Sequence, residues 1–325
     1  MQSILLIGGG GYIGTVVIEH FVKLGFEVTI IDNFIYKHNL FLNKFFKKYK
    51  DVKIINRDIA KIKNFEKLLE NKNYVVFLAG LVGDPITKKY PNLALKINRD
   101  ATKNLISKIS LSNIEKFIFI STCSNYGLIK NDQQADESYI LNPISLYAKL
   151  KVEIEKFIIS INEINFCPTI LRFATAFGFS NRMRLDLTVN EFVYEMYFNK
   201  KLLVYDPDTW RPYCHVKDFA RLIEEIITAK KSIIKNQIYN AGSDENNYTK
   251  RQLVSLISKY INDCEISYQK HGSDPRNYRV SFQKLQNDLN FKTKYNLKEN
   301  IPLLIEEIKN TKFLDKKNYG NYLIK

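Results

Sequence analysis

Short apolar runs rich in β-branched residues alternate with amphipathic segments from the first residues of this chain. Between the apolar runs, hydrophobic side chains recur at the i, i+3, i+4 spacing of a helix. Strands that alternate with helices form crossover units, which predict a parallel sheet covered by helices on both faces. The predicted strands are residues 3–9, 27–32, 52–58, 74–80, 116–122, 169–174 and 237–242.

The length and the change in texture along the chain predict two domains. The chain has 325 residues, more than the usual domain of about 100–200 residues. After Gly178 the segments become longer, more polar and less regular. We therefore expect the α/β fold class, with a Rossmann-type doubly wound parallel sheet in residues 1–178 that the chain rejoins at about 205–243. A smaller mixed α/β domain for substrate binding is expected from residues 179–204 and 244–325.

The composition excludes several classes of protein. The net charge is +15, but lysines scattered along the chain supply most of it, so we interpret it as a solvated surface without a nucleic-acid partner. The four cysteines lie far apart and indicate free thiols in a reducing compartment, with neither disulfides nor a metal site. No apolar run approaches a membrane span of about 18 residues, and the apolar start runs into glycines without a basic leader. We expect a cytoplasmic protein without a membrane partner.

The stretch GGGGYIG predicts a dinucleotide-binding turn. It follows the first predicted strand, opens a helix, and places Gly8, Gly11 and Gly14 three residues apart. Such a turn lets the diphosphate approach the free N–H groups at a helix N-terminus. Asp32 ends the next strand 18 residues after Gly14, where a carboxylate can accept from a ribose 2′-hydroxyl and repel a 2′-phosphate. The pattern favours NAD over NADP. Asp58 either holds the adenine amino group or caps a loop.

The stretch SLYAKLK places Tyr147 and Lys151 four residues apart at the start of a helical segment. Residues at i and i+4 share one helix face, so the ammonium is expected beside the phenol. A phenol has a pKa of about 10, and a neighbouring cation together with an oxidised nicotinamide can lower it toward neutrality. Thr122 ends the fifth predicted strand, at the edge where open α/β sheets bind ligands. These three residues are the candidate catalytic group.

With these motifs in their order, the chain resembles the extended short-chain dehydrogenase/reductase superfamily, in its sugar-nucleotide epimerase/dehydratase branch. The motifs that carry the resemblance are the glycine turn, LAG at 78–80, STCSNYG at 121–127, the Tyr147 and Lys151 pair, LRFATAFG at 171–178, and WRPYCHVKD at 210–218. The resemblance implies a nucleotide-diphosphate sugar as substrate and a homodimer that includes the helix bearing Tyr147. The cofactor-binding candidates are Gly8, Gly11, Tyr12, Ile13, Gly14, Asp32, Asn33, Asp58, Ile59, Leu78, Ala79, Gly80, Asn98, Tyr147 and Lys151.

The same resemblance implies roles for residues on the substrate side. Arg211 and Arg276 are expected to bind the diphosphate, since guanidinium groups suit phosphate oxygens, although Arg211 can instead form a structural ion pair. Asn190 is expected near the base or the phosphates, and His215 is interpreted as a packing residue. The substrate-binding candidates are Thr122, Cys123, Ser124, Thr175, Asn190, Arg211 and Arg276.

The residues after Thr122 restrict the reaction. In the family's 4,6-dehydratases an Asp and a Glu typically follow the catalytic threonine, whereas Cys123 and Ser124 stand here. A thiol with a pKa of about 8.5 and a hydroxyl are poor substitutes for that acid and base pair, and we interpret Cys123 as a packing group. We therefore expect oxidation of a C4 hydroxyl by an epimerase or dehydrogenase, with UDP-, dTDP- and GDP-sugars, a GDP-linked heptose among them, as candidate substrates for surface polysaccharide biosynthesis. The alternatives are a 4,6-dehydratase and a non-catalytic NAD-sensing or RNA-associated protein.

Overall fold

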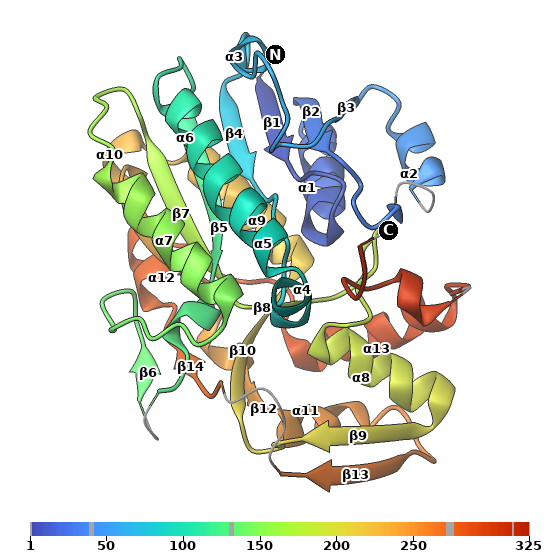
Figure 1. Ribbon diagram of the computed structural model, residues 1–325. Coiled ribbons are helices and arrows are strands. Elements are labelled where there is room, and N and C mark those ends of the chain that lie inside the picture. The colour runs from blue at the N-terminus through green and yellow to red at the C-terminus, as the bar shows by residue number, and fades with distance from the viewer. Residues whose placement is uncertain (1, 39–41, 130–132, 271–275, 314, 325) are drawn as a thin grey trace.

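Seven parallel strands form the centre of the fold. The computed structural model describes residues 2–38, 42–129, 133–270, 276–313 and 315–324. Every pairing in the large sheet is parallel, and the strand order is β11-β7-β5-β4-β1-β2-β3 (Figure 1). The expected doubly wound sheet is thereby confirmed. Its strands are β1 (Ser3–Ile7), β2 (Glu27–Asp32), β3 (Lys53–Asn56), β4 (Tyr74–Phe77), β5 (Lys116–Thr122), β7 (Pro168–Phe173) and β11 (Gln237–Ala241).

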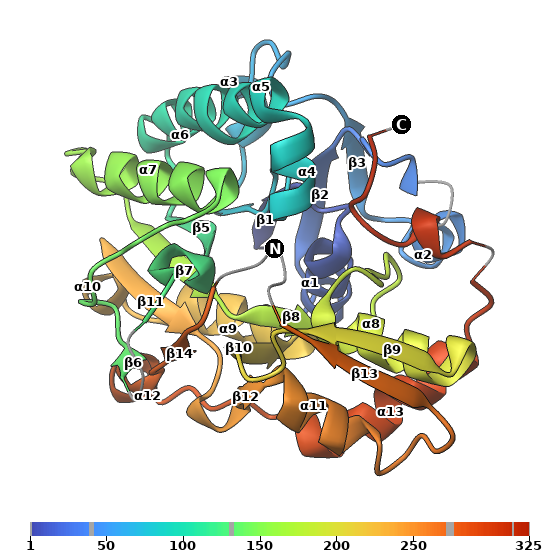
Figure 2. The same ribbon diagram turned by 60° about the horizontal axis from the view of Figure 1, so that its bottom comes forward.

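Alternating residues of the central strands build two hydrophobic cores, one on each face of the sheet. In β1, Ile4 and Leu6 belong to one core, whereas Leu5 and Ile7 belong to the other. Helices α1 (Tyr12–Lys23) and α9 (Val216–Thr228) cover the first face, and α6 (Thr102–Ser110) and α7 (Leu146–Ser160) cover the second (Figures 1 and 2). Burial on both faces explains why these strands are continuous apolar runs.

Shorter helices complete the large layer. A nearly continuous helical run leads through α4, α5, η2 and α6 to β5, with a π-helical turn at η2. Tight 3-10 turns follow β5, β11 and the last helix. The bounds of these elements are α2 (Asn43–Lys48), α3 (Glu66–Leu69), α4 (Asp84–Lys89), α5 (Pro91–Ala94), η2 (Leu95–Ala101), η3 (Cys123–Tyr126), α10 (Lys231–Ile234), η5 (Asp244–Asn246), α12 (Gln283–Leu289) and η6 (Lys316–Asn318).

Three small sheets lie beyond the carboxyl ends of the large sheet. Strand β10 pairs with β8 and β12, β9 pairs with β13, and β6 pairs with β14. Together with three helices they form the lower part of the molecule in Figure 1. The elements are β6 (Gln134–Ala135), β8 (Thr175–Phe177), β9 (Lys201–Tyr205), β10 (Trp210–His215), β12 (Asn247–Thr249), β13 (Glu265–Gln269), β14 (Arg279–Val280), α8 (Thr188–Tyr194), η4 (Glu195–Asn199), α11 (Lys250–Ile257) and α13 (Leu297–Lys309).

The chain passes between the two parts more than once. Strand β10 belongs to a small sheet, helix α9 packs against α1 of the large layer, and β11 joins the large sheet at its edge. The segment after α13 then runs back toward the large layer and ends near α2 and β3 in both views (Figures 1 and 2). The division into two domains with a return at about 205–243 stays our proposal. In this arrangement, residues 216–241 are the part of that return that lies in the large layer.

Membrane and metal features are absent from the part of the chain that the structure describes. Within those residues, no helix combines the length and apolar character that crossing a membrane requires. The same residues contain no group of three His, Cys, Asp or Glu side chains that could hold a metal ion. All four cysteines are free thiols, and three of them are buried.

A buried lysine joins β5 to α9. The Lys116 ammonium donates hydrogen bonds to the carbonyl oxygens of Ile226, Ile227 and Ala229, which lie at the C-terminal end of α9. A cation at this position satisfies carbonyl groups that have no partner within the helix and interacts favourably with the helix dipole. This contact fixes the helix layer against the sheet strand that ends at Thr122.

We predict that Lys116→Met lowers the free energy of unfolding by about 2 kcal/mol, because the buried carbonyl groups lose a charged donor. Urea denaturation followed by circular dichroism measures this change. The control is Lys67→Met on α3, where the lysine is exposed, and a change below about 0.5 kcal/mol is expected. Equal stability of the two variants would contradict this role of Lys116.

Candidate active site

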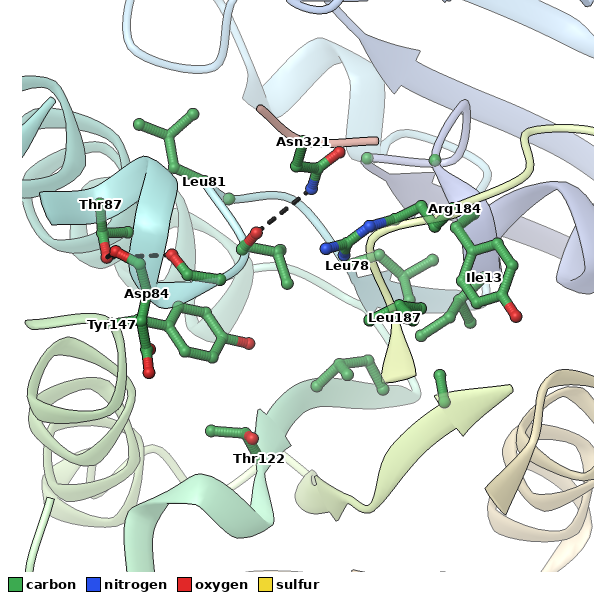
Figure 3. Close-up of a pocket in the computed structure, with 18 of the residues that line it drawn as sticks. Ile13, Leu78, Leu81, Asp84, Thr87, Thr122, Tyr147, Arg184, Leu187 and Asn321 are labelled. Atoms are coloured by element: carbon green, nitrogen blue, oxygen red, sulfur yellow. Dashed lines mark hydrogen bonds between the residues drawn. The ribbon is translucent and has the colours of Figure 1, made fainter. Parts of the chain in front are cut away.

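A cavity of about 1210 Å³ lies at the carboxyl edge of the large sheet and extends into the lower part of the molecule. Residues after β1, β2, β4 and β5 line one side, and the segment after β8 lines the other (Figure 3). Ligands of open α/β sheets bind at this edge. The cavity contains all the predicted cofactor-binding residues except Asn98, and all the predicted substrate-binding residues except Cys123 and Asn190.

The glycine turn allows the backbone to approach the neighbouring strand closely. Gly8 has a φ of +86°, and a Cβ at this residue would lie 2.5 Å from the backbone nitrogen of Ala79. A Cβ at Gly14 would lie 2.4 Å from the carbonyl oxygen of Gly9. At Gly11 the nearest atom would be 3.4 Å away, because this glycine faces the cavity. Gly8 and Gly14 therefore shape the turn, whereas Gly11 leaves room above it.

Asp32 is held in place by two backbone N–H groups. Its Oδ2 accepts from Gly10 at 2.9 Å and its Oδ1 accepts from Phe34 at 2.8 Å. Burial raises the pKa of the carboxyl, and the two backbone hydrogen bonds oppose this shift. Each oxygen can accept one further hydrogen bond, as a ribose diol requires. This acceptor and the open space above Gly11 fit an NAD molecule.

The helix α7 begins beside the end of β5 and carries the predicted catalytic pair. Ser145 caps the helix by accepting from the backbone N–H of Ala148 at 3.2 Å, which places Tyr147 in the first turn. The Lys151 ammonium donates to the carbonyl oxygen of Ile120 at 2.6 Å. In Figure 3 the Tyr147 ring points into the cavity above Thr122. The structure thus brings Thr122, Tyr147 and Lys151 to one wall of the cavity.

Burial dominates the acidity of the pair. It raises the pKa of the Tyr147 phenol above the ordinary value of 10.0; the Asp84 carboxylate raises it further, and Arg184 and Arg276 lower it. Burial also lowers the pKa of Lys151 from 10.5 to about 8. The cations that lower the phenol pKa here are Arg184 and Arg276, and burial outweighs them. An oxidised nicotinamide bound in the cavity would add a further positive charge near the phenol.

A cluster of polar side chains lies near Tyr147 in the cavity. Arg276 donates to the Ser124 hydroxyl at 3.0 Å and forms an ion pair with Asp84 at 3.2 Å. The Ser124 and Tyr278 hydroxyls are 3.3 Å apart. Arg211 donates to the carbonyl oxygen of Arg276, and its guanidinium lies over the Tyr278 ring. Both arginines line the cavity, so this cluster offers positive charge to an anionic ligand.

Three residues that were predicted to contact a ligand do not line the cavity, namely Asn98, Asn190 and Cys123. The Asn98 amide forms two hydrogen bonds with the backbone of Leu81, at 2.8 and 2.9 Å. Asn190 accepts from the Gly178 N–H at 3.0 Å and donates to the Tyr12 hydroxyl at 3.0 Å. The geometry therefore favours a supporting position for both asparagines, with their amides satisfied by neighbouring loops.

The buried residues Cys123 and His215 also point away from the cavity. The Cys123 thiol donates to the carbonyl oxygen of Arg172 at 3.1 Å, because side chains alternate between faces at the end of a strand. The His215 ring accepts from the Lys217 N–H at 3.1 Å and caps α9. Asp58 does line the cavity, but one of its oxygens accepts from the Ala60 N–H at 2.9 Å, as a loop cap does.

Several residues that line the opposite wall were not predicted from the sequence. Arg182 and Arg184 follow β8 and line the cavity, and Arg184 points toward its centre in Figure 3. Asn321 accepts from Arg182 at 2.9 Å and donates to the carbonyl oxygen of Val82 at 3.2 Å. The C-terminal segment therefore links the loop after β4 to the loop after β8. Only the unusual run NRMR offered a sequence signal; nothing in the polar tail indicated this role.

The comparison with known families agrees with this geometry. The model of the NAD dependent epimerase/dehydratase family matches residues 4–242. The chain belongs to this family. The resemblance deduced from the motifs is thereby confirmed, and so is NAD as the cofactor, which the family description names and the Asp32 site fits.

Individual relatives of this family member carry out different reactions. A UDP-N-acetyl-alpha-D-glucosaminuronate decarboxylase of Bacillus cytotoxicus is 27% identical over 74% of this chain and 75% of its own length. A UDP-glucose 4-epimerase of Rhizobium leguminosarum bv. trifolii is 24% identical over 80% of this chain and 81% of its own length.

The solved structures establish the shared fold. The UDP-glucuronic acid 4-epimerase of Bacillus cereus, in complex with UDP-glucuronic acid and NAD, matches with a TM-score of 0.84 at 21% identity, over 95% of this chain and 99% of that chain. A NAD-dependent NDP-hexosamine 5,6-dehydratase matches with a TM-score of 0.83 at 20% identity, over 97% of this chain and the whole of that chain. The Rossmann-like sheet and the small sheets are thus those of this enzyme family.

We predict that Gly11→Ala weakens NAD binding at least tenfold, about 1.4 kcal/mol, because the added methyl group enters the space above the turn. The fold is expected to persist, since no atom lies closer than 3.4 Å to the new Cβ. Isothermal titration calorimetry measures the affinity and thermal unfolding serves as the control. Unchanged NAD affinity would show that the diphosphate does not lie above this glycine.

Proposed function

We propose that this enzyme oxidises the C4 hydroxyl of a nucleotide-linked sugar and transfers the hydride to NAD. The observation that carries the proposal is the meeting of Thr122, Tyr147 and Lys151 in the same cavity as the glycine turn and Asp32. A sugar hydroxyl placed against the Tyr147 and Thr122 oxygens would lie between the protein's proton acceptor and the cofactor site. NAD, when bound, accepts the hydride and contributes positive charge next to the phenol.

Each of the three residues has a separate task in this proposal. Tyr147 removes the hydroxyl proton, and the loss of hydride leaves a carbonyl group at C4. Lys151 stays charged around neutral pH, because its pKa of about 8 lies above that range. Thr122 accepts from the Ser124 N–H at 3.1 Å, so its own hydroxyl hydrogen is free to donate to the sugar oxygen.

The diphosphate of the substrate is assigned to Arg211 and Arg276. Both guanidinium groups line the cavity on the substrate side of Tyr147, and each is well suited to phosphate oxygens. Arg211 also has structural contacts, because it donates to the carbonyl oxygens of Trp210 and Arg276. In the proposal it binds the diphosphate in addition to these contacts.

Elimination of water is the second candidate reaction. Cys123 is buried away from the cavity and Ser124 is a hydroxyl, so neither supplies the acid and base expected of a 4,6-dehydratase. The observation that keeps this candidate is Asp84, a carboxylate that lines the cavity near Tyr147. This carboxylate is already engaged in an ion pair with Arg276, 3.2 Å away.

Mass spectrometry separates the possible outcomes. The enzyme is incubated with NAD and UDP-glucose, dTDP-glucose or a GDP-linked heptose, sugars of the kind used in surface polysaccharide biosynthesis. Loss of two hydrogens identifies a 4-dehydrogenase, and an unchanged mass with a new proton NMR spectrum identifies a 4-epimerase. Loss of water would instead show a dehydratase and contradict an outcome as epimerase or dehydrogenase.

A homodimer formed through α7 is part of the proposal. Glu153 of this helix pairs with Lys103 of α6 at 2.6 Å, and Ile159 near the end of the helix is 43% exposed. Two copies of this helix pair would form a four-helix contact behind the catalytic residues. Light scattering during size-exclusion chromatography measures the mass, and a monomer at micromolar concentration would contradict the dimer.

We predict that Tyr147→Phe lowers kcat by about 10²–10⁴-fold, the usual contribution of a general base, while NAD affinity changes little. Turnover assays and calorimetric NAD titration measure the two quantities. Tyr260→Phe is the control, because this tyrosine is 49% exposed and outside the cavity. Full activity of the Tyr147→Phe enzyme would remove the catalytic role, whereas no activity with any nucleotide sugar in the wild type would favour a non-catalytic NAD-binding protein.

A further inference from the structure

A buried carboxylate lies behind the catalytic wall, outside the cavity. Glu155 is on α7, four residues after Lys151 and eight after Tyr147, and is only 2% exposed. It does not line the cavity, so it has no contact with a ligand there. Burial of a carboxylate is costly unless hydrogen bonds and an opposite charge compensate it. The contacts of Glu155 therefore indicate what it does.

Glu155 accepts hydrogen bonds from residues on both sides of Thr122 in the sequence. One carboxylate oxygen accepts from the Ser121 hydroxyl and from the Asn125 amide, the latter at 2.8 Å. Ser121 precedes the catalytic threonine, and Asn125 lies in the 3-10 turn that follows it. The carboxylate therefore binds the stretch STCSNYG at two residues, Ser121 and Asn125. Packing alone does not require polar side chains at a buried strand end. Ser121 and Asn125 are explained by their hydrogen bonds to Glu155, and Thr122 by its proposed contact with the sugar.

An arginine completes the network from the neighbouring strand. Arg172 on β7 donates to the Glu155 carboxylate from Nε at 3.2 Å and from Nη2 at 2.8 Å. Its Nη1 donates to the Tyr126 hydroxyl at 3.0 Å, which in turn donates to Asn240 on β11 at 2.7 Å. One carboxylate therefore connects the catalytic helix with β5, β7 and, through this chain, the edge strand.

Such a network is not explained by stability alone. Replacing a buried ion pair with apolar residues of similar volume is often neutral or stabilising. What the pair does provide is geometric definition, because planar carboxylate and guanidinium groups fix distance and angle together. The elements that it fixes are the two that carry Thr122 and Tyr147.

The carboxylate also stands near the catalytic ammonium. The Lys151 ammonium is buried, donates to the Ile120 carbonyl oxygen and lies 4.5 Å from the centre of the Phe119 ring. Among the described residues, other ionisable groups in this region are the Tyr147 phenol on α7, Arg172 on β7, the Tyr126 phenol and Cys123 thiol after β5, and the Glu137 carboxylate, which interacts with Arg172. Glu155 is the carboxylate that raises the pKa of Lys151 against the effect of burial.

We propose that Glu155 is a positioning residue of the reaction: it holds the Tyr147 helix against the end of β5 and keeps the Lys151 ammonium charged. Arg172 orients the carboxylate and balances its charge within the protein. This inference rests on the proposed oxidation, because it assigns Glu155 to the support of Tyr147 and Lys151. It adds a residue that touches neither cofactor nor substrate.

The test compares Glu155→Gln with Glu153→Gln, two substitutions of the same type on the same helix. Glu153 is half-buried, lies outside the cavity and pairs with Lys103, so its replacement is expected to leave kinetics unchanged. Without the Glu155 charge, no carboxylate opposes the effect of burial on Lys151, so the pKa of Lys151 falls further. The reaction needs the charged ammonium, so activity is then lost at a lower pH. In a plot of kcat against pH, the alkaline limb should therefore move to lower pH by about one unit. At pH 8, kcat should fall about fivefold, because the charged fraction of Lys151 falls from about one half to about one tenth.

The outcomes distinguish positioning from a purely structural role. A folding defect would reduce activity equally at all pH values, leaving the alkaline limb in place. Glu155→Asp retains the charge but shortens the side chain, so it should lower kcat without moving the limb. This variant also serves if Glu155→Gln does not fold. A limb and a kcat unchanged in both variants would overturn the inference, while inactive Tyr147→Phe in the same assay would show that the proposed oxidation itself still stands.

Discussion

The hydrogen bond from the Lys151 ammonium to the carbonyl oxygen of Ile120 is the contact on which the catalytic wall depends. It joins the first turns of α7 to Ile120, two residues before the end of β5, at 2.6 Å. With this contact in place, Tyr147 lies one helical turn earlier and its ring faces the cavity above Thr122. The contact also takes a charge out of water, which explains the lowered pKa of Lys151. Because a buried charge is costly without partners, charged and polar groups are needed behind the wall, and Glu155 and Arg172 supply them.

The cavity forms where the sheet edge meets the smaller layers. The glycine turn and Asp32 come from the sheet, whereas Arg182 and Arg184 come from the loop after β8. The C-terminal segment closes the gap, since Asn321 bonds to Val82 on one side and to Arg182 on the other. A ligand in this cavity therefore touches both parts of the chain. This arrangement suits a reaction in which a cofactor and a second, anionic molecule must lie together.

The sequence predicted those features that repeat with a regular period or depend on neighbouring residues. The strands follow from apolar runs and the turn from glycine spacing, and both lie where they were expected. The pair of Tyr147 and Lys151 needed only the four-residue spacing of a helix. Even the interpretation of Cys123 as a packing group rested on local alternation of side chains, and the buried thiol has that orientation.

Features that depend on contacts between distant segments could not be predicted in this way. Asn321 lies 239 residues after Val82, and Arg184 approaches Tyr147 from a loop in the other half of the chain. Asn98 and Asn190 were expected to touch ligands, but both amides are satisfied by nearby backbone groups. The burial that raises the pKa of Tyr147 likewise depends on all the walls of the cavity together.

Deuterium at C4 of the nucleotide sugar tests the central claim most directly. The protein with bound NAD is mixed with the deuterated form of whichever of UDP-glucose, dTDP-glucose or the GDP-linked heptose it converts, and the cofactor is analysed by mass spectrometry after rapid quenching. Our interpretation predicts that deuterium appears in the nicotinamide ring during turnover, and that cofactor reduction is slower than with the undeuterated sugar. Conversion of the sugar without deuterium in the cofactor at any quench time would contradict hydride transfer from C4 at the Tyr147 site.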